Sequence, residues 1–204
     1  DMFFVNCKGG ELFGKKLYKG RSEIDGDIDT AVITIPSKFV LDTIKELISK
    51  KIKNVIIISA GFKEVGDYDS ERIIAELAKE HNFNVIGPNC LGYLEGSKNL
   101  NLTFGIGGLQ RGDLALLSQS GAVLSALMDK AYDAGVGFSH LVSCGNMVDL
   151  DFAEMIDMLN KDESCKYISI YAEGIQNGKE FLRAIRESKK KAVSLILTMT
   201  ILIC

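Results

Sequence analysis

Short runs of apolar, often β-branched residues alternate along the chain with longer amphipathic segments. In segment 39–52, apolar residues recur at the spacing of a helix, and lysine and glutamate occupy positions between them. Nearly continuous apolar strands that alternate with helices are typical of parallel sheets covered on both faces. We therefore predict an α/β fold. The predicted strands lie at residues 31–35, 54–59, 84–86, 113–118 and 166–171.

The stretch 94–108 interrupts this alternation. It is rich in glycine and asparagine and has no helical period, so it is typical of a linker. We predict two small parallel-sheet domains, at residues 1–95 and 96–204, with the periodic part of the second beginning near residue 109.

Composition narrows the possible functions only slightly. The chain has 204 residues, 47% apolar content and a formal charge of -3, and this favours neither nucleic acid nor a membrane as a partner. Five cysteines without a C-x-x-C pair predict no disulfide framework and no metal site. No signal peptide opens the sequence, so we expect the reducing cytoplasm. Lysines 189–191 are interpreted as a solvated helix end.

Small and rigid residues follow the first three predicted strands. The sequence reads Ile35-Pro36-Ser37 after the first, Ser59-Ala60-Gly61 after the second and Gly87-Pro88-Asn89 after the third. Ligands of such sheets bind beyond the carboxyl ends of the strands, so these turns predict a groove where backbone approaches a ligand closely. The alternative is that proline and glycine merely end the strands.

A polar insert, Ser118-Gln119-Ser120-Gly121, separates the strand at 113–118 from a helix expected at 122–134. Ser118 or Ser120 would cap that helix, whose free N–H groups favour an anion. Capping alone explains one serine, whereas two serines, a glutamine and a glycine suit an anion better. We therefore predict an anion site at this helix start.

A serine nucleophile is the rival interpretation of the insert. The pattern S-Q-S-G differs from the G-x-S-x-G of a nucleophile elbow. A catalytic triad would also need His81 or His140. His81 is interpreted as a surface residue at a helix end, and His140 as a strand residue between apolar neighbours. The sequence therefore favours an anion site over a hydrolase.

Five motifs occur in the order found in one protein family. They are Val5-Asn6-Cys7-Lys8-Gly9-Gly10-Glu11, Ile35-Pro36-Ser37-Lys38-Phe39-Val40, Ile58-Ser59-Ala60-Gly61-Phe62-Lys63-Glu64, Gly87-Pro88-Asn89-Cys90-Leu91-Gly92 and Ser118-Gln119-Ser120-Gly121-Ala122. Over about residues 2–197 the chain resembles the alpha subunit, or alpha-like half, of ADP-forming acetyl-CoA synthetases. More distantly it resembles the alpha subunit of succinyl-CoA synthetase.

The resemblance implies a fold and an activity. It implies a Rossmann-like CoA-binding domain followed by a flavodoxin-like domain of the succinyl-CoA synthetase type. It also implies a ligase that interconverts acetyl-CoA, ADP and phosphate with acetate, CoA and ATP. The family's reaction passes through an acyl phosphate and a phosphorylated histidine.

The resemblance also assigns roles to residues that match the family's motifs. Glu173 is expected to orient the phosphohistidine, although a solvated strand end is the simpler alternative. Ser125 is expected in the acyl pocket, where the succinate enzyme has a tyrosine. The phosphoryl group is expected at Ser118, Gln119, Ser120 and Gly121. The expected CoA contacts are Lys8, Pro36, Ser37, Ile58, Ser59 and Ala60, with Pro88, Asn89 and Cys90 near the thiol.

The sequence departs from the family's pattern at both ends. It begins at what resembles the second strand of the CoA-binding domain, so we expect this domain to lack its first strand and the Gly-rich turn after it. Residues 192–197 match a strand of the family, but residues 198–204 do not resemble the family's continuation. The phosphorylated histidine has no counterpart in the sequence, because neither His81 nor His140 lies in its motif.

These departures shape the expected partners. ADP or ATP, with magnesium, is expected on an ATP-grasp beta subunit or domain that this sequence does not contain. We expect a hetero- or homo-oligomer in which this chain is a fragment of the enzyme and is inactive alone. The alternative is a non-catalytic CoA-binding or protein-interaction module derived from the same family.

Overall fold

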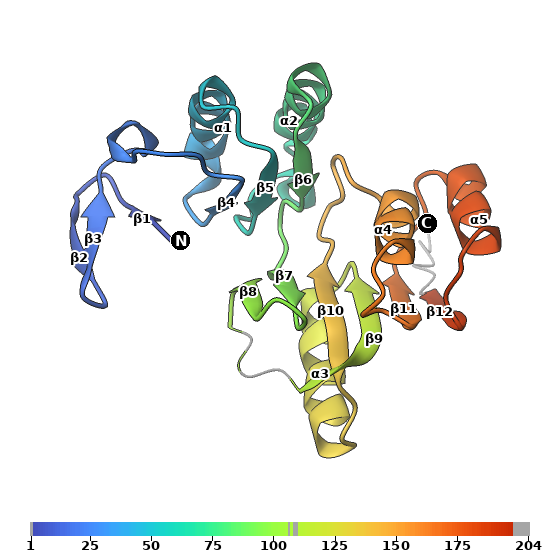
Figure 1. Cartoon of the computed structure of the whole chain (residues 1–204). Helices are drawn as coiled ribbons and strands as arrows, with labels where there is room; N and C mark the ends of the chain where they lie inside the picture. The colour runs from blue at the N-terminus through green and yellow to red at the C-terminus, as the bar shows by residue number, and fades with distance from the viewer. Residues whose placement is uncertain (1, 106, 108–109, 198–204) are drawn as a thin grey trace.

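The computed structural model describes residues 2–105, 107 and 110–197, whose strands form three sheets (Figure 1). Two α/β units lie side by side, and a small sheet stands at the amino-terminal end (Figure 1). The predicted α/β class with two parallel-sheet units is confirmed. Among the described helices, none combines the length and the apolar character that a membrane span requires.

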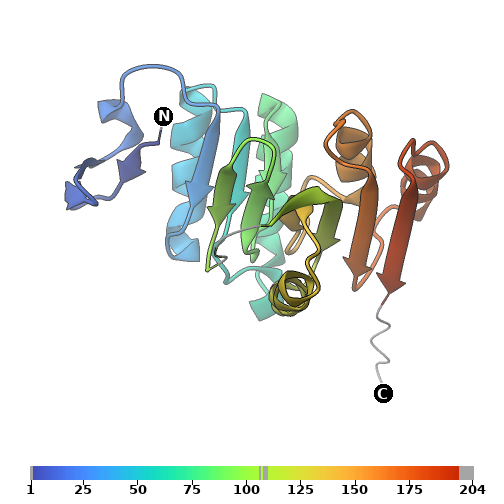
Figure 2. The ribbon, with the colours of Figure 1, turned by 60° about the horizontal axis from the view of Figure 1, so that its bottom comes forward.

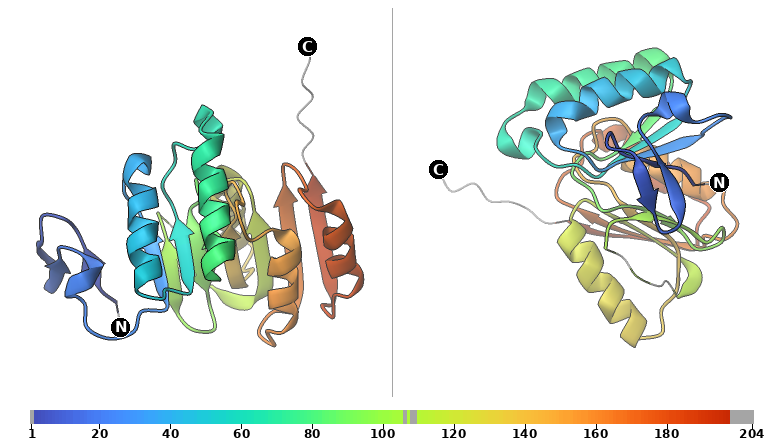
Figure 3. Two further views of the ribbon diagram at one scale, coloured as in Figure 1. Left: turned by 90° about the horizontal axis from the view of Figure 1, so that it is seen from above. Right: turned by 90° about the vertical axis from the view of Figure 1, so that its left-hand side faces the viewer.

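The first α/β unit has a parallel sheet with the order β4-β5-β6. Its strands are β4 (Thr30–Ile33), β5 (Asn54–Ile57) and β6 (Asn84–Ile86), and its helices are α1 (Val40–Ser49) and α2 (Tyr68–His81). Both helices cover the same face of the sheet (Figure 3). Short 3₁₀ turns lie at Arg21–Glu23, Ser37–Phe39 and Lys63–Val65.

An apolar stripe holds these helices on the sheet. Val40 and Ile44 of α1 and Ile74 of α2 are completely buried in one cluster with the strands. Complete burial of such an aliphatic side chain stabilises a fold by roughly 1.5–3 kcal/mol. The carboxylate of Asp67 accepts the N–H of Ser70 and so caps the start of α2. The helical spacing in the sequence and the buried face therefore agree.

The second unit has a mixed sheet with the order β12-β11-β9-β10-β7-β8. Neighbours among β9 to β12 are parallel, and Figure 2 shows β11 and β12 running in the same direction. The strands are β7 (Gly92–Glu95), β8 (Leu100–Thr103), β9 (Arg111–Ser118), β10 (Phe138–Ser143), β11 (Tyr167–Ala172) and β12 (Ala192–Leu197). The helices are α3 (Gly121–Asp133), α4 (Phe152–Asn160) and α5 (Gly178–Arg186).

The two faces of this sheet carry different helices. Helices α4 and α5 lie on one face and α3 on the other (Figure 3). Strand β9 alternates between them: Ala115 and Leu117 belong to the cluster that contains α4 and α5, whereas Leu116 packs with Leu124 of α3. This alternation is the period of two that a strand imposes on its side chains. Burial on both faces explains why residues 114–117 of the strand are all apolar.

The interpretation of residues 94–108 as a linker was wrong for residues 94–103, whereas residues 106 and 108 lie outside the described part of the chain. Strands β7 and β8 form a hairpin there, and β7 pairs with β10 at the edge of the second sheet. Leu94 is 3% exposed and packs in the cluster that contains Leu116 and Leu141. The burial of Leu94 depends on β10, which is distant in the sequence.

The amino-terminal segment forms its own sheet of β1 (Phe4–Val5), β3 (Lys15–Tyr18) and β2 (Gly10–Leu12), in that order. Strand β1 is parallel to β3, and β2 is antiparallel to it. Among the described strands, none of these three pairs with β4. The segment that resembles a strand of the CoA-binding sheet therefore stands apart from that sheet here.

The interpretation of lysines 189–191 as a solvated helix end also needs correction. Helix α5 ends at Arg186, and the lysines belong to the connection that leads into β12. The side chain of Lys190 is half-buried, and its Nζ donates to the carbonyls of Asp162 and Cys165 at 2.7 and 2.9 Å. Lys190 therefore links the connection between α5 and β12 to the connection between α4 and β11 by hydrogen bonds.

Candidate functional site

The turns that follow β4, β5 and β6 contact one another at the carboxyl edge of their sheet. Ser59 Oγ donates to the carbonyl of Ile35 at 2.5 Å, and the N–H of Asn89 donates to the carbonyl of Ser59 at 3.0 Å. A Cβ atom at Gly61 would lie 2.6 Å from Ser37 Oγ, so glycine lets the first two turns approach. The three turns therefore converge, as the sequence predicted.

The residues expected to bind CoA form an open edge. Pro36 and Ala60 are exposed, while Ser37, Ile58 and Ser59 are half-buried. A cavity of about 750 Å³ lies elsewhere, at the opposite, amino ends of β9, β10 and β11. Its lining includes Arg111, Asp113, Gly137 and Lys166. None of the predicted site residues lines this cavity, so the site is argued from the converging turns.

A carboxylate closes the turn after β5. Glu64 Oε1 accepts the N–H groups of Gly61 and Phe62 at 2.5 and 3.2 Å. Burial would raise the pKa of Glu64, but these hydrogen bonds and one from Asn146 outweigh burial and hold the pKa below its ordinary value. The ionised carboxylate thus occupies both N–H donors, which are not available to a ligand.

The turn after β6 is buried. Pro88 follows a cis peptide bond, and Asn89 adopts a φ of 58°. Cys90 is 5% exposed, and its thiol donates to the carbonyl of Ile57 at 3.3 Å. Burial raises the pKa of the Cys90 thiol to about 12, so the thiol stays protonated at neutral pH. Of the three residues expected near the thiol of CoA, Asn89 is the exposed one.

The polar insert ends β9 and begins α3. Ser118 is completely buried, and its Oγ donates to the carbonyl of Ser120 at 2.7 Å. Ser120 is the N-cap, and its Oγ accepts the N–H of Val123 at 3.3 Å. The N–H groups of Gly121 and Ala122 have no hydrogen-bond acceptor among the described residues. These two donors, at the positive end of the helix, can hold an anion.

Gln119 ties the loop after β11 to this helix start. Its Oε1 accepts the N–H groups of Glu173 and Gly174 at 2.6 and 3.0 Å. Its own N–H donates to the carbonyl of Tyr171 at 3.1 Å. The carboxylate of Glu173 is exposed, and no described residue forms a hydrogen bond or ion pair with it. The backbone of Glu173 is therefore fixed beside α3 while its carboxylate stays free.

Sequence reasoning missed the loop after β10, which joins the two units. The N–H of Asn146 donates to the carbonyl of Pro88 at 2.9 Å. Its side-chain amide donates to Glu64 Oε2 at 2.8 Å and to Glu71 Oε1 at 2.5 Å. The carbonyl of Asn146 accepts Lys63 Nζ at 2.7 Å. Asn146 is thus a buried link between the carboxyl edges of the two sheets.

Gly145 makes this link possible. Its φ is 58°, and a Cβ atom there would lie far inside van der Waals contact with the carbonyl oxygen of Pro88 and 2.8 Å from that of Asn89. Only glycine fits both conditions without strain. The signal was present in the sequence, because a glycine and an asparagine follow a buried strand here as small polar residues follow β4, β5 and β6.

Two expected site residues lie away from this junction. Lys8 belongs to the turn between β1 and β2, where its N–H donates to Asn6 Oδ1 at 3.0 Å. In the described part of the chain, no hydrogen bond or ion pair joins its side chain to another candidate residue. Ser125 is exposed on α3, and its Oγ donates to the carbonyl of Gly121 at 3.1 Å. The roles of both residues remain predictions.

Comparison with protein families divides the chain in two. Residues 1–95 match the family described as CoA binding domain. Residues 111–200 match the family described as succinyl-CoA ligase like flavodoxin domain. The candidate site thus lies where the carboxyl edges of the two sheets meet, and residues from both matched regions contribute to it.

The curated relatives include ADP-forming acetate–CoA ligases and ligases for other acids. The chain is 41% identical over 190 residues to an ADP-forming acetate–CoA ligase of Methanocaldococcus jannaschii, a match that covers 93% of this chain and 27% of that protein. It is 40% identical over 189 residues to the alpha subunit of ADP-forming acetate–CoA ligase II of Pyrococcus furiosus, covering 92% of this chain and 41% of that subunit. The chain therefore spans less than half the length of these relatives.

Solved structures share the fold. A crystal structure of a Pyrococcus horikoshii OT3 protein matches with a TM-score of 0.92 and 38% identity, covering 96% of this chain and 45% of that chain. Dinucleotide forming acetyl-coenzyme A synthetase 1 of Candidatus Korarchaeum cryptofilum, in complex with phosphate and ADP, matches with a TM-score of 0.90 and 37% identity, covering 95% and 42%. The chain thus combines a CoA-binding domain with a succinyl-CoA ligase-like flavodoxin domain and is a homologue of the alpha subunits of ADP-forming acetyl-CoA synthetases.

Proposed function

We propose that this chain forms part of an acid–thiol ligase that interconverts acetyl-CoA, ADP and phosphate with acetate, CoA and ATP. One observation carries the proposal. The unpaired N–H groups of Gly121 and Ala122 and the free carboxylate of Glu173 lie at one junction, and Gln119 holds the two segments together. A phosphoryl group needs such donors, and a catalytic histidine needs such a carboxylate.

CoA would bind along the edge formed by the turns after β4, β5 and β6. The exposed Pro36 and Ala60 offer a surface for its nucleotide part, and the amide of Asn89 would lie near its sulfur. Lys8 would supply a positive charge for a phosphate of CoA. Cys90 would support the turn by packing, because its protonated, buried thiol cannot attack a thioester.

The phosphoryl group would pass over the start of α3. A phosphate oxygen attacks the thioester carbonyl carbon, the carbon–sulfur bond breaks, and CoA leaves as the thiol with one proton. A histidine nitrogen then attacks the phosphorus of the acyl phosphate, and acetate leaves with the bridging oxygen. The N–H groups of Gly121 and Ala122 would hold the non-bridging oxygens, and Ser125 would line the pocket of the acyl group.

The histidine would come from another part of the enzyme. His81 is exposed at the end of α2, and His140 is buried in β10 beside Asp162. Neither lies at the start of α3. Glu173 would accept the N–H of the incoming imidazole and fix its orientation.

The phosphohistidine would then transfer its phosphoryl group to ADP on an ATP-grasp subunit or domain that also holds magnesium. We propose that this chain assembles with such a partner in the cytoplasm. The four cysteines among the described residues are all unpaired, which suits a reducing compartment.

The test is Gly121→Val in the complete enzyme that contains this chain. The valine side chain would cover the two N–H donors, so histidine phosphorylation should fall by roughly 10²–10³-fold, the range for losing one oxyanion donor. CoA affinity, measured by calorimetry, should be little changed. Loss of phosphorylation with retained CoA binding is the expected result; unchanged phosphorylation would favour the non-catalytic CoA-binding module.

A second variant separates anion binding from packing. A Cβ atom at Gly121 would lie 2.9 Å from Leu91 Cγ, so the valine also crowds Leu91. Adding Leu91→Ala removes this contact and should restore the melting temperature. Phosphoryl transfer should stay low in the double variant. If transfer recovers together with stability, the loss came from packing and the phosphoryl site is not at α3.

A further inference from the structure

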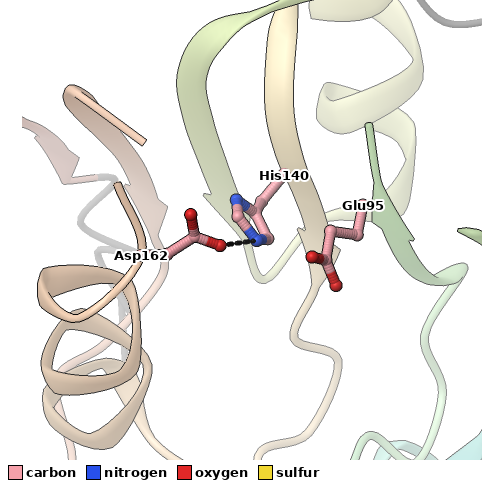
Figure 4. Close-up of side chains that lie close together, drawn as sticks. All are labelled: Glu95, His140 and Asp162. Atoms are coloured by element: carbon pink, nitrogen blue, oxygen red, sulfur yellow. Dashed lines mark ion pairs between the residues drawn. The ribbon is translucent and has the colours of Figure 1, made fainter. Parts of the chain in front are cut away.

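Three side chains of metal-ligand type meet on the second sheet, in a place that the proposed reaction does not use (Figure 4). His140 of β10 lies directly opposite Glu95 of β7 in the antiparallel ladder, so their side chains share one face. Asp162 comes from the connection between α4 and β11. One ligand atom from each residue lies within 4.8 Å of the other two.

The histidine of this cluster is buried and incompletely bonded. His140 is 2% exposed, and its Nε2 lies 3.3 Å from Asp162 Oδ2 (Figure 4). Its Nδ1 is buried and has no hydrogen-bond partner among the described residues. The side chain lines a cavity of about 350 Å³ together with Glu95, Asp162, Tyr93 and Lys98. Buried polar atoms nearly always have a partner, so Nδ1 indicates a missing water molecule, whereas Nε2 is the nitrogen that faces Asp162.

In this structure, the ammonium group of Lys98 balances the negative charge of Glu95. Its Nζ lies 3.0 Å from Glu95 Oε1, yet its side chain is 72% exposed whereas that of Glu95 is 6% exposed. Glu95 also accepts hydrogen bonds from the hydroxyls of Tyr93 and Ser97 at 3.1 and 3.0 Å. The exposed lysine can leave by rotation into solvent, which would free the carboxylate of Glu95 to turn toward an ion.

We propose that Glu95, His140 and Asp162 bind a single divalent transition-metal ion, of which Zn²⁺ and Co²⁺ are the representative cases. One imidazole nitrogen with two carboxylate oxygens suits these ions, whereas Mg²⁺ and Ca²⁺ prefer oxygen ligands throughout. The ion would tie the β7–β8 hairpin and the connection before β11 to β10. The bound ion would therefore stabilise the second unit and would take no part in the transfer reaction.

The geometry needs one local adjustment. Tetrahedral bonds of about 2.1 Å put neighbouring ligand atoms about 3.4 Å apart. The 3.3 Å between His140 Nε2 and Asp162 Oδ2 already meets this requirement. Glu95 would close the remaining gap as it exchanges Lys98 for the ion. Water from the adjoining cavity would take the fourth position.

The test is titration of the purified protein with Co²⁺. We expect one equivalent to bind with the visible absorption of a tetrahedral nitrogen–oxygen site and to raise the melting temperature. The sequence has two histidines, so proton NMR should show a paramagnetic shift of the His140 resonance and none of His81. His140→Gln should weaken binding at least tenfold, and the matched His81→Gln should not. Equal binding by His140→Gln, or a thiolate-to-cobalt charge-transfer band, would overturn the proposal.

Two surface-accessible variants keep the test decisive if His140→Gln fails to fold. Asp162→Asn removes a ligand charge from a side chain that is 29% exposed and should also weaken binding at least tenfold. Lys98→Ala removes the competing cation and should strengthen Co²⁺ binding several-fold. A merely structural ion-pair cluster predicts no Co²⁺ binding by any variant, and that result would refute the site.

Discussion

The turn after β6 (residues 87–90) and the start of α3 (residues 118–122) lie at the same junction but use their polar groups in opposite ways. In the turn, the carbonyl of Pro88 accepts the N–H of Asn146 and the thiol of Cys90 donates to a buried carbonyl. At the helix start, two backbone N–H groups have no acceptor within the described residues. The turn is therefore a closed support, and the helix start is an open donor site.

This difference does not appear in composition. Both segments are short, small and polar, and both follow the carboxyl end of a strand. A ligand gains affinity from donors that the protein leaves unpaired, because donors already bonded must first be released. The turn at residues 87–90 and the helix start at residues 118–122 therefore differ in whether their polar groups already have hydrogen-bond partners, and not in their residue types. Each of the following changes tests one side of that distinction.

The largest expected effect is on the chemical reactivity of Cys90 in the closed turn. Burial raises the pKa of the Cys90 thiol to about 12, and the thiolate is the reactive form. At about pH 8, alkylation of Cys90 by iodoacetamide should therefore be at least ~1000-fold slower than that of an ordinary exposed thiol. Exposed Cys7 supplies the internal reference, and peptide mass spectrometry measures both. Equal labelling of the two would mean that the turn opens readily.

The next effect concerns the loop that locks the closed turn. Gly145→Ala would force a Cβ atom against the carbonyl oxygen of Pro88 at a positive φ, and should lower the free energy of unfolding by about 3 kcal/mol. Gly135→Ala is the matched control, because Gly135 has a φ of 68° and open space around it. It should cost only about 1 kcal/mol. Urea unfolding measures both, and equal costs would show that the contact with Pro88 is not a constraint.

A smaller effect is expected from Gln119, which joins the start of α3 to the loop that carries Glu173. Gln119→Ala removes the acceptor of two backbone N–H groups, so the loop would no longer hold Glu173 beside α3. Phosphoryl transfer in the complete enzyme should fall about tenfold or more, since each of the two lost hydrogen bonds is worth about 0.5–1.5 kcal/mol. Gln119→Glu keeps the acceptor but adds a negative charge, so it should restore the order of the loop while phosphate binding stays weak. Identical behaviour of the two variants would contradict the positioning role.

Much of the element pattern could be predicted because it is local. Strands β4, β5, β6, β9 and β11 are apolar runs that a short window contains, and they lie where the sequence predicted them, while β12 lies where the family resemblance implied a strand. The β7–β8 hairpin was missed because its strands gain their burial from β10. Short strands carry too little periodicity to stand out from a linker.

The site could be predicted in part for the same reason. Its turns follow predicted strands, so their convergence follows from the topology of parallel sheets. Asn146 could not be assigned its role, because its partners Pro88, Glu64 and Glu71 are remote in the sequence. The choice of Ser120 over Ser118 as the cap also needed the structure, since either serine fits the pattern.

The smallest expected effect concerns the hydroxyl of Ser120, and it decides whether this hydroxyl only caps α3 or also binds the phosphoryl group. Ser120 caps α3, and Ser120→Ala should destabilise the fold by about 1 kcal/mol. Ser120→Gly also lacks the hydroxyl, but a glycine cap costs only a few tenths of a kcal/mol. If the hydroxyl also donates to the phosphoryl group, both variants should lose a similar several-fold share of transfer per folded molecule while their melting temperatures differ. If Ser120 serves only as a cap, transfer per folded molecule should be unchanged in both, and the backbone donors of Gly121 and Ala122 alone would hold the anion.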